Sequence, residues 1–208
     1  MTPLLEKITA IFDKPVTMLP NTVHRSWYNL NEDINRLSTP RLTYFPGTRS
    51  HDKDFATIKP VLEQLLSEEP ELKLQITGVL TTDLRCRSEQ LILQPKQPFA
   101  DYANQVAKSW VNLAPLEDTE FNHHKSALKA IEASWFNAPT LASPIPDMQR
   151  LQAAGAELMY SQQDWYSAIK ALLNHAHYAS KQPLREKILA IASAEQNAKQ
   201  FLLFVSQL

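Results

Sequence analysis

The chain has 208 residues, of which 44% are hydrophobic and 21% charged, and its formal net charge is -1. A chain of this length buries roughly 70% of its unfolded surface, so we expect one core and a single domain over residues 1–208. A nearly neutral chain has no overall attraction to nucleic acid or to an anionic membrane. Any anion-binding site must therefore be built locally.

The cysteine content and the N-terminal sequence indicate the cellular compartment of the protein. Cys86 is the only cysteine, so no intrachain disulfide can form and a reducing compartment fits. The first residues carry acidic side chains and lack the apolar stretch of a signal peptide. The longest apolar run, residues 201–205, is too short to cross a bilayer. We therefore expect a cytoplasmic protein without a transmembrane segment.

The elements predicted from hydrophobic periodicity begin with a linker segment over residues 1–39. This segment contains a helix near 3–13, a short strand at 16–19 and a turn at 20–21. From residue 40 onward, strands alternate with helices. The predicted strands are 41–45, 72–80, 91–94, 110–116, 139–143 and 157–160. The predicted helices are 54–68, 100–109, 121–135, 146–154, 163–177 and a long helix over 184–205 within the C-terminal segment 184–208.

This alternation predicts a Rossmann-like three-layer α/β/α fold with a mostly parallel sheet. Strands separated by helices of this length form parallel βαβ units, and right-handed crossovers place helices on both faces. Ligands on such sheets bind beyond the carboxyl ends of the strands. The loops of interest are therefore 46–53, 78–83, 95–99, 115–125 and 143–147.

Two of these loops are rich in hydrogen-bond donors and precede predicted helices. The first contains Thr48, Arg49, Ser50, His51 and Lys53, and the second contains Asn122, His123, His124, Lys125 and Ser126. A helix amino end offers unpaired N–H groups and a dipole that contributes about 0.3–1 kcal/mol to anion binding. Two such ends with added lysines and hydroxyls have the charge and span for a diphosphate.

The second of these helices carries three charged residues on one face. Lys125, Lys129 and Glu132 are spaced i, i+4 and i+7. A carboxylate at Glu132 would suit the two vicinal hydroxyls of a ribose. The alternative is a solvated face with ordinary ion pairs, and spacing alone favours that alternative.

The stretch "VNLAPLEDTEFNHHKSALKAIEASWFNAPTLASP" resembles the donor-binding signature of glycosyltransferase family 4 and its close relatives. The matched elements are "NLAPLE", "FN..KS.LK..EA" and "AP..AS". Upstream, "YFPGTRSHDKDFA" resembles the first donor-domain loop of that group. The resemblance implies the donor half of a retaining enzyme with GT-B architecture, which is built from two Rossmann-like halves.

The resemblance also implies roles for individual residues. Glu132 would hold the nucleotide ribose, while Lys125 and Ser126 would face the diphosphate. Lys53, with Arg49 or Thr48, would neutralise the diphosphate as it leaves. The loop around Phe99 would border the base. Further contacts from the same loops are expected from Gly47, His51 and Asn122.

Two departures from the family pattern are visible. The usual first glutamate of the motif stands eight residues before the second, and His124 occupies that position here, with Glu120 four residues earlier. The acceptor half, of similar size, has no counterpart in this sequence. We therefore expect a nucleotide-sugar donor domain that needs a separate acceptor-binding domain or chain. A non-catalytic nucleotide-sugar-binding or assembly module is the alternative.

Other site chemistries find less support in the sequence. His123 and His124 are adjacent and His175 and His177 are two apart, so neither pair converges on a metal. We expect neither a metal nor a cofactor besides the donor substrate. His51 is open to two interpretations, a ligand contact or a helix cap formed with Asp52.

Overall fold

The computed structural model describes residues 3–12, 14–174 and 183–207. Its centre is a six-stranded sheet in the order β3-β2-β1-β4-β5-β6, and every strand pair is parallel. The strands are β1 (Arg41–Tyr44), β2 (Lys73–Thr77), β3 (Leu91–Gln94), β4 (Val111–Ala114), β5 (Thr140–Ala142) and β6 (Ala156–Leu158). The predicted parallel α/β sheet is confirmed.

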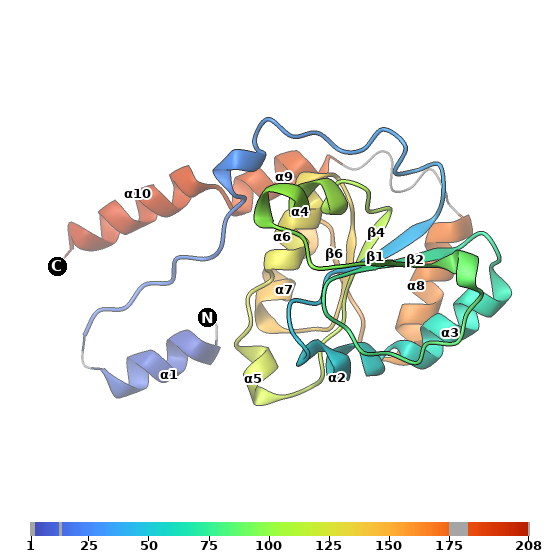
Figure 1. Ribbon diagram of the computed structural model, residues 1–208. Helices are drawn as coiled ribbons and strands as arrows, with labels where there is room; N and C mark the ends of the chain where they lie inside the picture. Colours follow the sequence, from blue (N-terminus) through green and yellow to red (C-terminus); the bar gives the residue numbers. More distant parts are fainter. Residues whose placement is uncertain (1–2, 13, 175–182, 208) are drawn as a thin grey trace.

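Helices cover both faces of the sheet and complete the three layers (Figure 1). One face is covered by α4 (Phe99–Val106), α6 (Leu128–Trp135), α7 (Pro146–Arg150) and α9 (Leu184–Ile191). The opposite face is covered by α2 (His51–Ala56), α3 (Lys59–Glu68) and α8 (Gln162–Asn174). Short 3₁₀ turns lie at Arg25–Trp27, Ser88–Gln90 and Gln152–Ala154.

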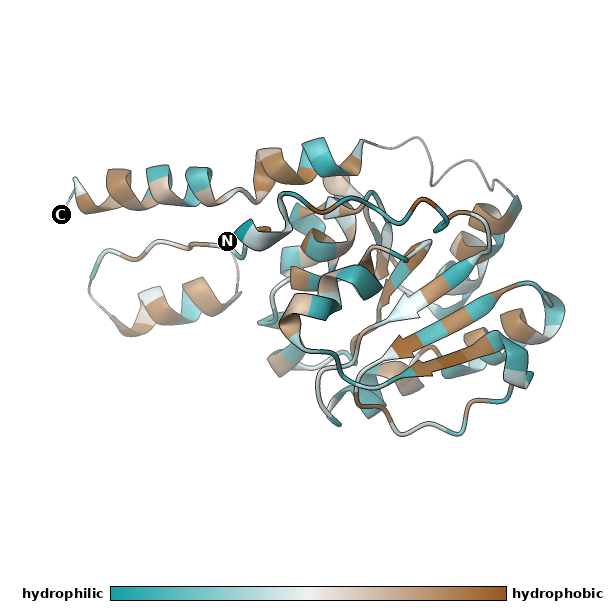
Figure 2. Cartoon of the chain, turned by 45° about the horizontal axis from the view of Figure 1, so that its top comes forward, coloured by the Kyte–Doolittle hydropathy of each residue, from teal (hydrophilic) through white to brown (hydrophobic). Residues whose placement is uncertain are grey.

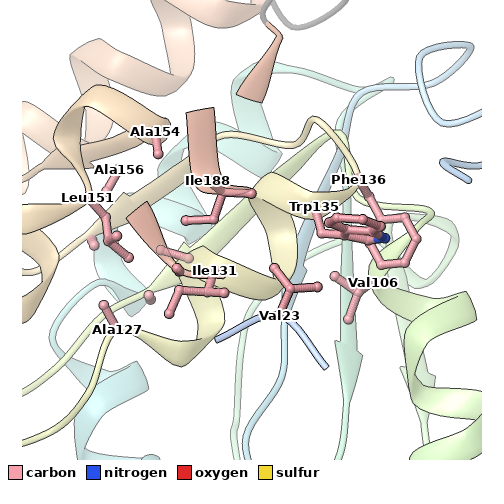
Figure 3. Packing of buried hydrophobic residues seen from close by; sticks show 14 of the residues in the cluster. Val23, Val106, Ala127, Ile131, Trp135, Phe136, Leu151, Ala154, Ala156 and Ile188 are labelled. Carbon is pink, nitrogen blue, oxygen red and sulfur yellow. The ribbon is translucent and has the colours of Figure 1, made fainter. Parts of the chain in front are cut away.

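The hydrophobic core is divided by the sheet into two clusters. On the α6 side, Val106, Ile131, Trp135 and Ile188 are buried and pack together (Figure 3). On the α3 and α8 side, the buried cluster includes alternate residues of β1, Leu42 and Tyr44. Such alternation follows from the two-residue period of a strand.

A row of buried polar side chains crosses the α6 face of the sheet. Thr43 is in register with Gln75 and Asn112, and Asn112 is in register with Thr140. The Asn112 amide donates to the Thr140 hydroxyl at 3.1 Å and to the Lys129 carbonyl oxygen at 3.4 Å. Because a buried amide needs partners, this row fixes where α6 lies on the sheet.

The predicted helix over 54–68 is two helices in the structure. Its first part belongs to α2, and α3 begins at Lys59 with Pro60 in its first turn. A proline lacks the N–H that the helix interior requires, but that N–H is not needed in a first turn. Pro60 therefore fits at the start of α3, and the prediction of one continuous helix is wrong.

The predicted helix over 121–135 is also broken, with a consequence for the site. It divides into α5 (Glu120–His123) and α6, and Lys125 and Ser126 lie in the loop between them. The Asp147 carboxylate accepts the N–H of Ala127 at 2.8 Å, which takes this N–H out of any helical hydrogen bond. Lys125 therefore does not stand on the helix face that carries Lys129 and Glu132.

The chain ends also differ from the prediction. Residues 16–19 form no strand, whereas the predicted N-terminal helix is present as α1 (Pro3–Ile11). The long terminal helix divides into α9 and α10 (Ala194–Val205), because the Ser193 hydroxyl caps a new helix by accepting the Gln196 N–H at 3.2 Å. His175 and His177 lie outside the described residues.

Helices α1 and α10 extend away from the sheet (Figures 1 and 2). The last turns of α10 expose large apolar side chains, namely Phe201, Leu202, Leu203 and Val205. Across the residues that the structure describes, no helix is long and apolar enough to span a membrane.

Gly78 provides a test of the backbone geometry next to β2. It has φ +139°, and a Cβ atom there would lie 2.0 Å from the Pro46 carbonyl oxygen. We expect Gly78→Ala to lower the free energy of unfolding by roughly 2 kcal/mol or more, measured by urea denaturation. Gly47→Ala is the control, because its Cβ would meet only His51 Nε2 at 3.9 Å. Equal effects of the two substitutions would contradict this geometry.

Candidate functional site

A cavity of about 550 Å³ lies at the carboxyl ends of the central strands β1 and β4. Three segments supply most of its polar lining: the loop after β1 with Gly47 and His51, the start of α4 with Phe99, and the region from Lys125 to Glu132. The volume falls within the range of about 300–1,000 Å³ that is typical of ligand sites. The position is the one where parallel α/β sheets bind ligands.

Unpaired backbone donors line this cavity at the start of α6. The N–H groups of Ser126, Leu128 and Lys129 have no acceptor among the described residues, and all three residues line the cavity. Such groups at a helix amino end carry partial positive charge. Together with the ammonium groups of Lys125 and Lys129, they make this wall suited to an anion.

Lys129 and Glu132 are half-buried rather than solvated, so the alternative of a solvated face is wrong. The Lys129 ammonium donates to the Phe45 carbonyl oxygen, and burial lowers the pKa of this lysine. Burial also raises the pKa of Glu132, although nearby Lys129 opposes that shift. The Tyr102 hydroxyl donates to Glu132 Oε2 at 2.8 Å and holds the carboxylate in place.

Asp54 is the centre of a buried hydrogen-bond network that includes Lys125. Its Oδ1 accepts the Glu117 N–H at 2.9 Å and the Asn122 amide at 3.0 Å. Its Oδ2 lies 3.0 Å from His51 Nδ1 and 3.4 Å from the Lys125 ammonium. Burial would raise the pKa of this carboxyl, but the hydrogen bonds and the lysine charge lower it to about 2. Asp54 therefore joins the loop after β1 to the loop after β4.

An aromatic group borders the opposite side of the cavity. The Phe99 ring is 51% exposed and lines the cavity. It stacks on Trp27 with ring centroids 5.9 Å apart and meets His24 edge-on at 4.8 Å. A partly exposed ring held by two others is a preformed surface for a flat ligand group.

The sequence-predicted site residues divide into two groups in space. Those that line the cavity are Gly47, His51, Phe99, Lys125, Ser126 and Glu132. Those that do not are Lys53, Thr48 and Arg49, which are exposed, and Asn122, whose buried amide donates to Asp54 and to the Glu117 carbonyl oxygen. The structure thus brings Lys125 and Glu132 together and leaves Lys53 outside the lining.

Sequence reasoning missed Asp54 and Tyr102, and it did not include Lys129 among the site residues. The "HD.DF" stretch contains Asp54, but its role depends on contacts with residues more than 60 positions away. Tyr102 lies one turn into α4, and no sequence signal linked it to Glu132. His51 contacts Asp54 rather than pairing with Asp52, which instead accepts the Thr81 N–H at 3.1 Å.

Comparisons with known proteins identify the fold. No protein-family model matches the chain, and no curated protein matches it in sequence. S. aureus TarM, in complex with fondaparinux, α-GlcNAc-glycerol and UDP, superimposes with TM-score 0.71 and 15% identity over 96% of this chain and 41% of that chain. Anabaena HepE, in complex with UDP and glucose, gives TM-score 0.65 and 11% identity over 86% and 54%.

A third neighbour is a related sugar-nucleotide enzyme. The UDP-GlcNAc 2-epimerase of Neisseria meningitidis, bound to UDP-GlcNAc, has TM-score 0.52 and 14% identity over 80% of this chain and 45% of that chain. At these identities the likeness establishes the fold, which is that of one Rossmann-like half of the GT-B architecture. The chain spans about half of the length of these neighbours, or less.

The low pKa of Asp54 predicts a stability change in acid. Because its folded pKa lies below its unfolded value of 3.8, the ionised carboxylate stabilises the fold above pH 4. That contribution, of about 2 kcal/mol, is lost as the pH falls from 4 towards 2. We expect Asp54→Asn to be less stable than the parent above pH 4 and the difference to shrink in acid, as measured by urea denaturation.

The control for this prediction is Asp101→Asn. Asp101 is exposed, and its side chain has no hydrogen-bond partner among the described residues. Its replacement should leave the pH dependence of stability as in the parent. A difference between parent and Asp54→Asn that stays constant from pH 7 to about 2 would contradict the assigned role of Asp54.

Proposed function

We propose that this chain binds a nucleoside diphosphate sugar and acts as the donor half of a glycosyltransferase. The observation that carries the proposal is the cavity at the start of α6, where Lys125, Lys129, Glu132 and unpaired N–H groups line one wall. The bound UDP or UDP-sugar in the structural neighbours supports the ligand class. The family 4 signature described above supports the donor half and the retaining outcome.

The diphosphate is assigned to the wall between α5 and α6. The N–H groups of Ser126, Leu128 and Lys129 are positioned to donate to phosphate oxygens, and Lys125 supplies a full positive charge beside them. Lys125 is itself held by Asp54 at 3.4 Å, so the ammonium is preorganised before the ligand arrives. Preplaced charge of this kind stabilises the negative charge that develops on a leaving diphosphate without a metal ion.

The nucleoside is assigned to the side of the cavity formed by Phe99, Gln97 and Glu132. Glu132 is oriented by the Tyr102 hydroxyl, and its carboxylate is suited to accept hydrogen bonds from both ribose hydroxyls. The Phe99 ring provides the apolar border for the base. Lys53 is exposed and lies two residues along the chain from His51, which lines the cavity. We assign it a weaker role, in which its positive charge attracts the negatively charged ligand without contacting it.

Transfer to an acceptor requires a further binding surface, and we assign the larger part of it to a separate domain or chain. The neighbours are about twice as long as this chain. Helix α10 extends from the body and exposes Phe201, Leu202 and Leu203, which offers an apolar face for a docked partner (Figure 2).

The second candidate function is a nucleotide-sugar binder without transfer activity, and His124 favours it. A glutamate is usual at this position in the resembled family. Here His124 Nδ1 contacts the Glu120 carbonyl oxygen at 2.6 Å, and His124 lines a separate cavity of about 180 Å³ instead of the larger one. Measuring donor hydrolysis or transfer after addition of a candidate acceptor domain separates the two functions.

Titration with UDP and GDP tests the proposed ligand. We expect isothermal calorimetry to detect micromolar binding of one of the two and Lys125→Ala to weaken it by about tenfold or more, since a charge-assisted contact is removed. Lys53→Ala is the matched control and should have a smaller effect. Binding that is absent or millimolar for both nucleotides would refute the proposal, and a dominant effect of Lys53 would refute the assignment of Lys125.

A nucleotide lacking the 2′-hydroxyl tests Glu132. The parent should prefer the ribonucleotide, because a carboxylate left with one hydroxyl loses a hydrogen bond worth roughly 1–3 kcal/mol. Glu132→Gln should reduce that preference while still binding the diphosphate. If the variant keeps the full preference in competition calorimetry, the ribose contact lies elsewhere.

A further inference from the structure

A second cavity, of about 410 Å³, opens beside the first at the carboxyl ends of β4, β5 and β6. Its lining comes from three loops: residues 116–118 after β4, residues 143–145 after β5 and residues 159–162 before α8. Leu116 lines both cavities, so the two spaces adjoin. The nucleotide-sugar proposal assigns no role to this second cavity.

The floor of the second cavity is apolar except for one unpaired donor. Trp165 is 4% exposed and Met159 is 7% exposed, and both belong to the core cluster on the α8 side. The Trp165 indole N–H has no acceptor among the described residues, although its ring is almost completely buried. The indole nitrogen itself is not completely buried, so its N–H is free to donate to a ligand oxygen in the cavity.

The walls add a free carboxylate and an exposed ring. The Glu117 side chain is half-buried and has no hydrogen-bond or ion-pair partner among the described residues. Its backbone is held on both sides, because its N–H donates to Asp54 at 2.9 Å and its carbonyl oxygen accepts the Asn122 amide at 2.8 Å. The Tyr160 ring is 71% exposed at the rim. Glu117 and Tyr160 therefore add an acceptor and an aromatic surface to the lining.

The charge of the lining restricts the class of ligand. Glu117 and Asp118 are acidic, and the only basic lining residue, His123, already pairs with Asp118 at 2.7 Å. A phosphate or a carboxylate would be repelled by this lining. The lining suits a molecule with apolar C–H faces and many hydroxyl groups. The apolar floor and the exposed ring would contact the C–H faces, and the free carboxylate and the free N–H would bond to hydroxyl groups.

We propose that this second cavity is a binding site for a neutral saccharide ring, held between the Tyr160 ring and the Glu117 carboxylate with an oxygen on the Trp165 indole N–H. Its role as the acceptor subsite rests on the proposed function, since the adjoining cavity is the one assigned to the donor. Leu116 then borders both substrates. Saccharide binding itself does not depend on the nucleotide.

Two-dimensional NMR of the ¹⁵N-labelled chain tests the site directly, because the Trp165 indole N–H is a reporter within it. The probes are methyl β-glucoside and cellobiose as neutral saccharides, and glucuronate as the anionic control. The signal is assigned by its absence in Trp165→Phe. We expect saturable movement of this signal at millimolar concentrations of the neutral probes and little movement with glucuronate.

Variants at the walls establish the contacts. Glu117→Gln and Tyr160→Ala should each weaken saccharide binding about fivefold or more, since each removes one contact and leaves the backbone bonds of Glu117 intact. Ile34→Ala is the control for truncation of an exposed side chain, because Ile34 is 92% exposed and lines neither cavity. An unmoved Trp165 signal with every neutral probe, or equal movement with glucuronate, would overturn the proposal.

A parallel titration with UDP separates this inference from the proposed function. If the chain binds saccharide but not UDP, the saccharide site is supported and the proposed donor function is refuted. UDP binding without saccharide binding removes only the saccharide site. Loss of the saccharide-induced shift on addition of UDP would show that both occupy one cavity, which overturns the second site.

Discussion

The buried carboxylate of Asp54 is the interaction on which the candidate site depends. It accepts hydrogen bonds from the Glu117 N–H and the Asn122 amide and lies within 3.4 Å of the Lys125 ammonium. An ionised carboxylate is tolerated in the core only when it is paired and hydrogen-bonded, which also explains its low pKa. Because Asp54 belongs to α2, this helix holds in place the segment of chain that follows β4.

The same hydrogen-bond network explains why the chain breaks between α5 and α6 and why polar groups line the cavity there. With Asn122 held by Asp54 and the Ala127 N–H held by Asp147, the chain between them cannot continue as one helix. The break leaves N–H groups at the start of α6 without acceptors and turns Lys125 towards the cavity. The buried polar row on the sheet then fixes the position of α6, because the Asn112 amide donates to the Lys129 carbonyl oxygen.

The two cavities share Leu116 but differ in character. One has lysines and unpaired backbone donors, and the other has carboxylates, an exposed ring and an unpaired indole N–H. The loop after β4 forms the boundary, since Asp54 fixes its backbone while the Glu117 side chain faces the second cavity. The two adjoining cavities therefore have opposite electrostatic properties.

The sequence by itself determined the parallel α/β fold, because the period of strands and helices is local and strands connected by helices pair in parallel. It also determined that Lys125, Ser126 and Glu132 lie near one another, since they are close along the chain. Only the tertiary structure decided that Lys53 stays outside, that Tyr102 orients Glu132 and that Asp54 anchors Lys125. These outcomes depend on contacts between residues far apart in sequence, and a helix breaks where such contacts capture its backbone N–H groups.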